Sequence, residues 1–130
     1  MYIYVCEDSI ESKLTCIYDA WKMATKVGHA NVKLLVGPIY MNTLFDELVY
    51  VESDSDKAGK VSQSISKKIS PDAYISVYYA LLSNEEDALD SAYRFLIIAF
   101  KMGSEALLAL NSPQNMRIME LRRRVGNEIH

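Results

Sequence analysis

The sequence predicts an α+β fold: a small N-terminal sheet of about three short strands and a mostly helical body around a buried central helix. Short runs of β-branched and aromatic residues, which are typical of strands, occur before residue 53. After residue 53, apolar side chains recur at helical intervals. Residues 95–100 are apolar without interruption, but a membrane span needs roughly 20 such residues, so we expect a helix buried inside the protein.

The length and composition are those of one ordinary globular domain, and we expect residues 1–130 to form a single domain. The net charge is −3 and is unevenly distributed. Residues 1–56 carry four Lys/Arg and nine Asp/Glu, whereas residues 57–130 carry ten and eight. A polyanionic partner would therefore have to bind the second part of the chain.

The N-terminus and the cysteines indicate the expected compartment. The first residues contain neither the basic region nor the long apolar run of a signal peptide, so we expect a cytoplasmic protein with no membrane partner. Cys6 and Cys16 are too few for a disulfide scaffold. Both lie in apolar patterns, where a thiol without a cationic neighbour is expected to be buried and inert.

Three strands are expected at residues 2–6, 31–36 and 47–52, where β-branched and aromatic side chains predominate. Between the first two strands, the sequence predicts a helix that Asp8 caps and Gly28 ends. This order permits a parallel pair of strands joined by a right-handed crossover. The apolar stripe of the helix comprises Ile10, Leu14, Ile17, Trp21 and Ala24, and Lys13 is placed away from it.

The second part of the chain predicts a series of helices. The first begins at Asp54 or Ser55 and buries a stripe of Ala58, Val61, Ile65 and Ile69. Two further helices begin at the serine–proline pairs 70–71 and 112–113, because proline is well tolerated at the first helical position. In the last of these helices the predicted buried stripe is Ile118, Leu121, Val125 and Ile129.

The central helix is expected to begin and end at recognisable caps. Ser83 is followed three residues later by Glu86, which is a capping-box pattern. Gly103 is suited to the C-cap. We therefore expect this helix over residues 85–102.

Positive charge is most concentrated in the last helix, in four arginines: Arg117, Arg122, Arg123 and Arg124. Arg117 and Arg124 are seven residues apart and share one side of the helix. In one interpretation these arginines are solvated charges with a structural ion pair to Glu120 or Glu128. In the other they bind phosphate, for which the planar guanidinium group is suited.

Catalytic groups are sparse. Glu128 and His130 are weak candidates, because on a continuous helix two such neighbours diverge by about 200° and would need further groups from elsewhere. Glu7 and Asp8 follow the first strand, where α/β folds place functional groups, although an N-cap role explains Asp8 as well. Metal-ligand spacing, phosphate-binding glycine loops and dinucleotide fingerprints are missing from the sequence, so we expect neither a metal nor a cofactor.

Four segments, at 4–21, 67–74, 93–96 and 121–130, resemble an uncharacterised bacterial family labelled "probable DNA metabolism protein". Similar domains occur beside a radical-SAM protein assigned to DNA modification or repair, or fused to a uracil-DNA glycosylase. The family's closing motif maps onto Arg123, Arg124, Val125, Asn127, Glu128 and His130. Because family members continue past this histidine, the resemblance implies that the chain is the N-terminal part of a longer protein.

Three functions are compatible with these patterns. The resemblance implies a DNA-repair or DNA-modification accessory module that works with a radical-SAM or glycosylase partner, and in it the four arginines, with His130, would approach DNA phosphate. The alternative is a protein-interaction scaffold without direct nucleic-acid contact, in which the arginines form internal ion pairs. A third is an enzyme that uses Glu128 and His130, so the sequence leaves open whether the protein is an enzyme at all.

Overall fold

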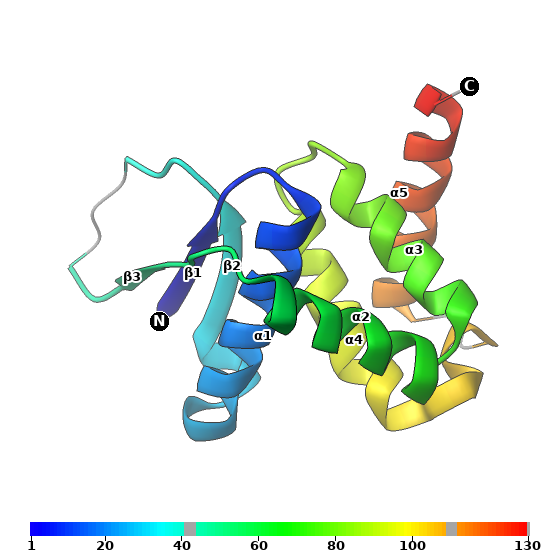
Figure 1. The fold of residues 1–130 in the computed structure, drawn as a ribbon, viewed down its shortest axis with the longest axis horizontal. Coiled ribbons are helices and arrows are strands. Elements are labelled where there is room, and N and C mark those ends of the chain that lie inside the picture. Colours follow the sequence, from blue (N-terminus) through cyan, green and yellow to red (C-terminus); the bar gives the residue numbers. More distant parts are fainter. Residues whose placement is uncertain (41–43, 109–111, 130) are drawn as a thin grey trace. The chain divides into compact units, whose positions relative to one another are not determined.

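The computed structural model describes residues 1–40, 44–108 and 112–129, except for the side chains of residues 107, 108, 128 and 129. It has an α+β fold with five α-helices and a three-stranded sheet, so the predicted fold class is confirmed (Figure 1). The chain divides into two compact units, Met1–Val61 and Ser62–His130. The expectation of a single domain stays a prediction.

Unit 1 contains the sheet and the helix that packs on it. Its elements are β1 (Tyr2–Cys6), α1 (Ile10–Val27), a short 3₁₀ helix (His29–Asn31), β2 (Val32–Val36), β3 (Glu47–Tyr50) and the first part of α2 (Ser55–Lys68). The strand order is β2-β1-β3, and both pairings are parallel. The three predicted strands are confirmed, with the second and third one and two residues shorter than expected.

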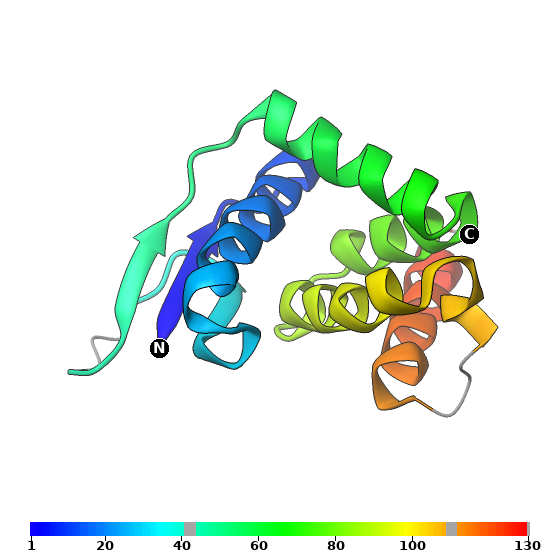
Figure 2. The same ribbon diagram turned by 90° about the horizontal axis from the view of Figure 1, so that it is seen from below.

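The two faces of this sheet differ in burial. Tyr4, Cys6, Val32 and Leu34 share one face and are buried, and α1 packs against β1 and β2. The opposite face is mixed, because Val5 is buried whereas its neighbour Tyr50 is exposed. Figure 2 shows α1 along one side of the strands, with β3 as an outer strand.

The start of α1 differs from the prediction by one residue. Ser9, not Asp8, is the N-cap, and its hydroxyl accepts a hydrogen bond from the Ser12 backbone N–H at 3.1 Å. Asp8 pairs instead with the Lys13 ammonium group at 2.9 Å. The expected position of Lys13 was also wrong, since this residue is buried. An adjacent serine can satisfy the free N–H groups of the first turn, which leaves the carboxylate for the lysine.

Unit 2 contains the remainder of α2, α3 (Pro71–Leu82), α4 (Ala88–Met102), a 3₁₀ helix (Gly103–Leu108) and α5 (Pro113–Ile129). Ser70 and Ser112 cap α3 and α5 as predicted, since their hydroxyls accept from Ala73 N at 3.0 Å and Asn115 N at 3.2 Å. The predicted stripe of α2 is buried, as are Ile118, Leu121 and Val125 of α5. The side chain of Ile129 lies outside the described residues.

The buried central helix is α4, which packs against α3 and α5 (Figure 1). Its fully buried side chains include Tyr93, Phe95 and Leu96. Its start was predicted incorrectly: Ser83 ends α3, and its hydroxyl accepts from Glu85 N at 3.1 Å. The helix begins at Ala88 after Asp87, whose carboxylate does not cap it because it accepts hydrogen bonds from side chains instead.

Within residues 1–40, 44–108 and 112–129, no helix is both long enough and apolar enough to cross a membrane.

Candidate functional site

Arg117 lies at the centre of a group of carboxylates in unit 2. It binds Asp87 with two nitrogens, Nε to Oδ2 at 2.8 Å and Nη2 to Oδ1 at 2.5 Å. Its Nη2 also donates to Glu85 Oε1 at 3.0 Å, and its Nη1 lies 3.6 Å from Glu120 Oε2. The loop before α4 and the first part of α5 are therefore joined by charge-assisted hydrogen bonds.

Arg124 completes this group, which we call the arginine–carboxylate cluster: Glu85, Asp87, Arg117, Glu120 and Arg124. Arg124 Nη1 donates to Glu85 Oε1 at 2.7 Å, and its Nη2 pairs with Glu120 one helical turn earlier. Three carboxylates thus face two guanidinium groups. The excess charge of the cluster is negative, which opposes the binding of phosphate.

Arg122 is engaged separately with α3. Its Nη1 lies 3.2 Å from Asp72 Oδ1 and donates to the buried Ser76 hydroxyl at 2.8 Å. This pairing lies beside the buried stripe of α5, and it couples that helix to α3. Together with the cluster, it engages three of the four arginines proposed for phosphate with groups of unit 2.

Arg123 differs from the other three arginines. Like Arg124 it is exposed, but unlike the other three it makes no ion pair with any described residue. Asn127, from the same closing motif, is also exposed. The Glu128 side chain and the whole of His130 lie outside the described residues, so their proposed catalytic role stays a prediction.

Sequence reasoning found only one of the acidic partners. Glu120 was expected, with Glu128, as a partner for one of the arginines, and it pairs with Arg124 one turn later. Glu85 and Asp87 were not expected as partners of the arginines. Glu85 and Asp87 are 32 and 30 residues away from Arg117 in the sequence. The periodicity of apolar residues does not predict contacts over such separations.

The electrostatics follow from these contacts. Hydrogen bonding to Arg117 lowers the pKa of the Asp87 carboxyl from its ordinary value of 3.8 to about 2. Hydrogen bonds from Arg117 and then Arg124 lower the pKa of Glu85. The carboxylates therefore remain charged and paired at neutral pH.

Replacing Arg117 by alanine is expected to lower the free energy of unfolding by about 1–2 kcal/mol at pH 7, because charge-assisted hydrogen bonds are lost at a partly exposed site. A folded-state pKa below the ordinary value stabilises the protein above that value, and this stabilisation is lost as the pH falls through the folded-state pKa. The difference between wild type and Arg117→Ala should therefore shrink between about pH 4.5 and pH 2.

Urea unfolding of both proteins at several pH values measures this difference. Arg123→Ala on the same helix is the matched control, because Arg123 has no carboxylate partner among the described residues, and it should change stability by less than about 0.5 kcal/mol. Equal effects of the two substitutions at pH 7 would contradict the structural role assigned to Arg117.

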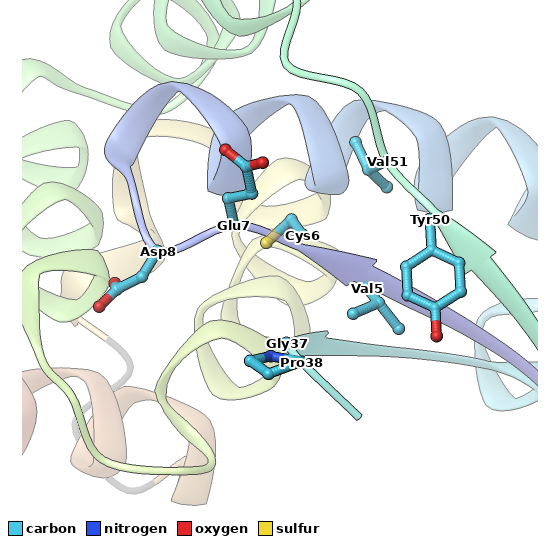
Figure 3. A pocket seen from close by; sticks show the side chains of 8 residues that line it. All are labelled: Val5, Cys6, Glu7, Asp8, Gly37, Pro38, Tyr50 and Val51. Atoms are coloured by element: carbon cyan, nitrogen blue, oxygen red, sulfur yellow. The ribbon is translucent and has the colours of Figure 1, made fainter. Parts of the chain in front are cut away.

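A pocket of about 410 Å³ lies at the carboxyl ends of the strands in unit 1. Figure 3 shows its eight lining residues: Val5, Cys6, Glu7, Asp8, Gly37, Pro38, Tyr50 and Val51. The carboxyl edge of a parallel sheet is where α/β folds bind ligands. The volume is within the range of small-molecule sites, roughly 300–1,000 Å³. Glu7 and Asp8, which follow the first strand, are among the lining residues, and a functional role for them stays a prediction.

The chemistry of this pocket is mixed. Apolar groups come from Val5, Pro38, Tyr50 and Val51. The Glu7 and Asp8 carboxylates point away from each other in Figure 3, and Asp8 is already paired with Lys13. The two acids therefore do not converge on one point as a general acid–base pair would.

Large apolar side chains are exposed in the connection between β2 and β3. Tyr40 and Leu44 are each 90% exposed, and Phe45 is 87% exposed. Tyr50, on β3 itself, is 66% exposed. These residues were not expected from the sequence to be functional, although three large apolar side chains in a connection between strands are a recognisable signal.

Among the described residues, no three His, Cys, Asp or Glu side chains come together as a metal site. Comparisons of the chain with models of protein families, with curated proteins and with solved structures find no match. Its function is therefore inferred from the geometry described above and from the resemblance of its segments.

Proposed function

We propose that this chain is a protein-interaction module of DNA metabolism, which binds a partner protein through the exposed apolar side chains of the β2–β3 connection. The exposure of Tyr40, Leu44 and Phe45 is the observation that carries the proposal. Large aromatic and aliphatic side chains that leave water on binding supply most of the affinity of protein interfaces. The DNA context comes from the family resemblance.

The charges of unit 2 favour a protein partner over a polyanion. Residues 62–130 contain eight Lys/Arg and eight Asp/Glu, so this unit has no net positive charge. Arg117, Arg122 and Arg124 are engaged with carboxylates. A DNA phosphate would have to displace these carboxylates, and separating a partly buried pair is costly.

The charges of unit 1 indicate the chemistry of the partner. Residues 1–61 contain six Lys/Arg and nine Asp/Glu, a net charge of −3. Glu47 and Glu52 are exposed close in sequence to Phe45 and Tyr50. We therefore expect the partner to present an apolar groove with a basic rim, since complementary charges orient such complexes and speed their association.

The test uses the purified, nuclease-treated radical-SAM protein and uracil-DNA glycosylase that the resemblance implies as partners. One of them should form a complex with the full chain, measured by calorimetry or gel filtration, without nucleic acid. Phe45→Ser should weaken binding by about tenfold or more, as expected for a central aromatic contact. Failure of both proteins to bind would refute the proposal.

Met116→Ser provides the matched control. Met116 is an exposed large apolar residue on α5, far in sequence from the β2–β3 connection. Its replacement should change the dissociation constant by less than about twofold. Equal losses of affinity in the two variants would contradict an interface at the β2–β3 connection.

Direct DNA binding is the second candidate, favoured by the resemblance and by the exposure of Arg123. A single phosphate contact would give weak binding with a logarithmic salt slope of about −0.9. Titration of a short fluorescent duplex at several salt concentrations tests this candidate, and Arg123→Ala should abolish the signal. Tight binding with a steep salt slope would instead favour the DNA-contacting module over the protein-interaction module.

A further inference from the structure

The two cysteines lie together in unit 1, although ten residues separate them in sequence. Cys6 is the last residue of β1, and Cys16 lies in the middle of α1, which packs on that strand. Both are free thiols and both are buried, and Cys16 is near enough to Cys6 to lower the pKa of the Cys6 thiol as a hydrogen-bonding neighbour. Cys16 Sγ also donates to the Tyr4 carbonyl oxygen at 3.6 Å. The dithiol is thus held between two packed elements.

A buried cation accompanies this dithiol. Lys13 is on α1, three residues before Cys16, and its charge favours the thiolate form of Cys6. The pKa of Cys6 lies below its ordinary value, first because of the hydrogen bond with Cys16 and second because of Lys13, while burial, Asp8 and Glu7 act in the opposite direction. The structure thus supplies the cationic neighbour that an inert buried cysteine lacks.

Cys6 also belongs to the lining of the pocket at the carboxyl end of the sheet (Figure 3). Its side chain as a whole is nearly inaccessible to bulk solvent. A small reagent that enters the pocket therefore arrives at the end of β1 that carries Cys6, whereas Cys16 is fully buried behind it. This arrangement distinguishes an attacking thiol from a resolving one.

We propose that Cys6 and Cys16 form a redox-modification site whose substrate is a small hydroperoxide. The Cys6 thiolate attacks the terminal peroxide oxygen, the O–O bond breaks, and the alkoxide that leaves takes up the proton that Cys6 had released to water, so the products are the Cys6 sulfenic acid and an alcohol. The Cys16 sulfur then attacks the Cys6 sulfur, forming the S–S bond and releasing water. Two thiols are oxidised by two electrons, and one hydroperoxide is reduced.

The experiment treats the reduced full chain with stoichiometric tert-butyl hydroperoxide. Remaining thiols are then blocked with N-ethylmaleimide in denaturant, and peptides are analysed by mass spectrometry without reduction. The expected result is a Cys6–Cys16 disulfide in most molecules, formed within one chain. If both cysteines are still labelled after a time in which a free thiol of a small peptide is consumed, the proposal is wrong.

Substitutions separate the two roles. Cys16→Ala should accumulate a Cys6 sulfenic acid that dimedone traps, whereas Cys6→Ala should leave Cys16 unmodified because it is fully buried. Dimedone trapping at Cys16 in the wild type, or disulfides between chains, would overturn the assignment. Lys13→Met should slow the reaction several-fold by removing the positive charge beside the thiolate.

Far-ultraviolet circular dichroism of each variant monitors the fold. A variant that unfolds is replaced by the corresponding serine variant. The wild-type measurement needs no substitution and by itself supports or refutes disulfide formation.

Discussion

Phe95→Ala is expected to lower the free energy of unfolding by about 3–5 kcal/mol, which is the usual cost of removing a buried aromatic side chain. Phe95 is 0% exposed and lies in α4, the buried central helix of unit 2. The loss has two parts. The variant no longer gains the free energy of burying the ring away from water, and a cavity remains where the ring packed. Equilibrium unfolding in urea, followed by circular dichroism, measures the difference.

The same substitution at Phe45 is the matched control. Phe45 is 87% exposed, so Phe45→Ala should change the free energy of unfolding by less than about 0.5 kcal/mol. A similar loss at both positions would mean that Phe45 is buried in solution. A loss below about 1 kcal/mol at Phe95 would contradict its place in the core.

Gly103→Ala is expected to lower the free energy of unfolding by about 1–3 kcal/mol, because its backbone conformation is strained for any residue with a Cβ. Gly103 ends α4 with φ 65° and ψ −139°, and its N–H donates to the Ala99 carbonyl. An added Cβ would lie 3.7 Å from the Lys68 carbonyl oxygen, an ordinary contact. The expected cost therefore comes from the backbone conformation and not from a steric clash.

Gly126→Ala is the control for that substitution. Gly126 lies inside α5, its φ is not positive, and nothing lies within 4 Å of an added Cβ. Alanine should therefore raise the free energy of unfolding by about 0.5–1 kcal/mol through its better helix propensity. Thermal or urea unfolding of both variants would contradict the interpretation if the two changes had the same sign.

Features encoded by neighbouring residues could be predicted from the sequence. The serine–proline starts of α3 and α5, the glycine ends of α1 and α4 and the buried stripe of α2 were all correct. Each depends on residues within one or two turns of each other. The parallel pairing of β1 and β2 was permitted by the helix between them, and it is confirmed.

Features decided by competition or by distant contacts could not be predicted. Ser9 caps α1 in place of the expected Asp8, whose carboxylate pairs with the buried Lys13. Ser83 and Glu86 matched a capping box, yet Ser83 ends α3, where its backbone N–H donates to the Ala80 carbonyl oxygen. Whether the arginines of α5 would bind phosphate or nearby carboxylates depended on Glu85 and Asp87, about 30 residues away.

The position of β1 has a consequence for the order in which the chain can fold. β1 is synthesised first but lies between β2 and β3, so Tyr2 pairs with Val32 on one side and with Glu47 on the other. Every ladder of hydrogen bonds in this sheet includes β1, and neither β2 nor β3 pairs with the other. During translation, β1 can therefore pair with β2 only after residue 36 has emerged and with β3 only after residue 50, and deleting β1 would remove the whole sheet and not only one edge.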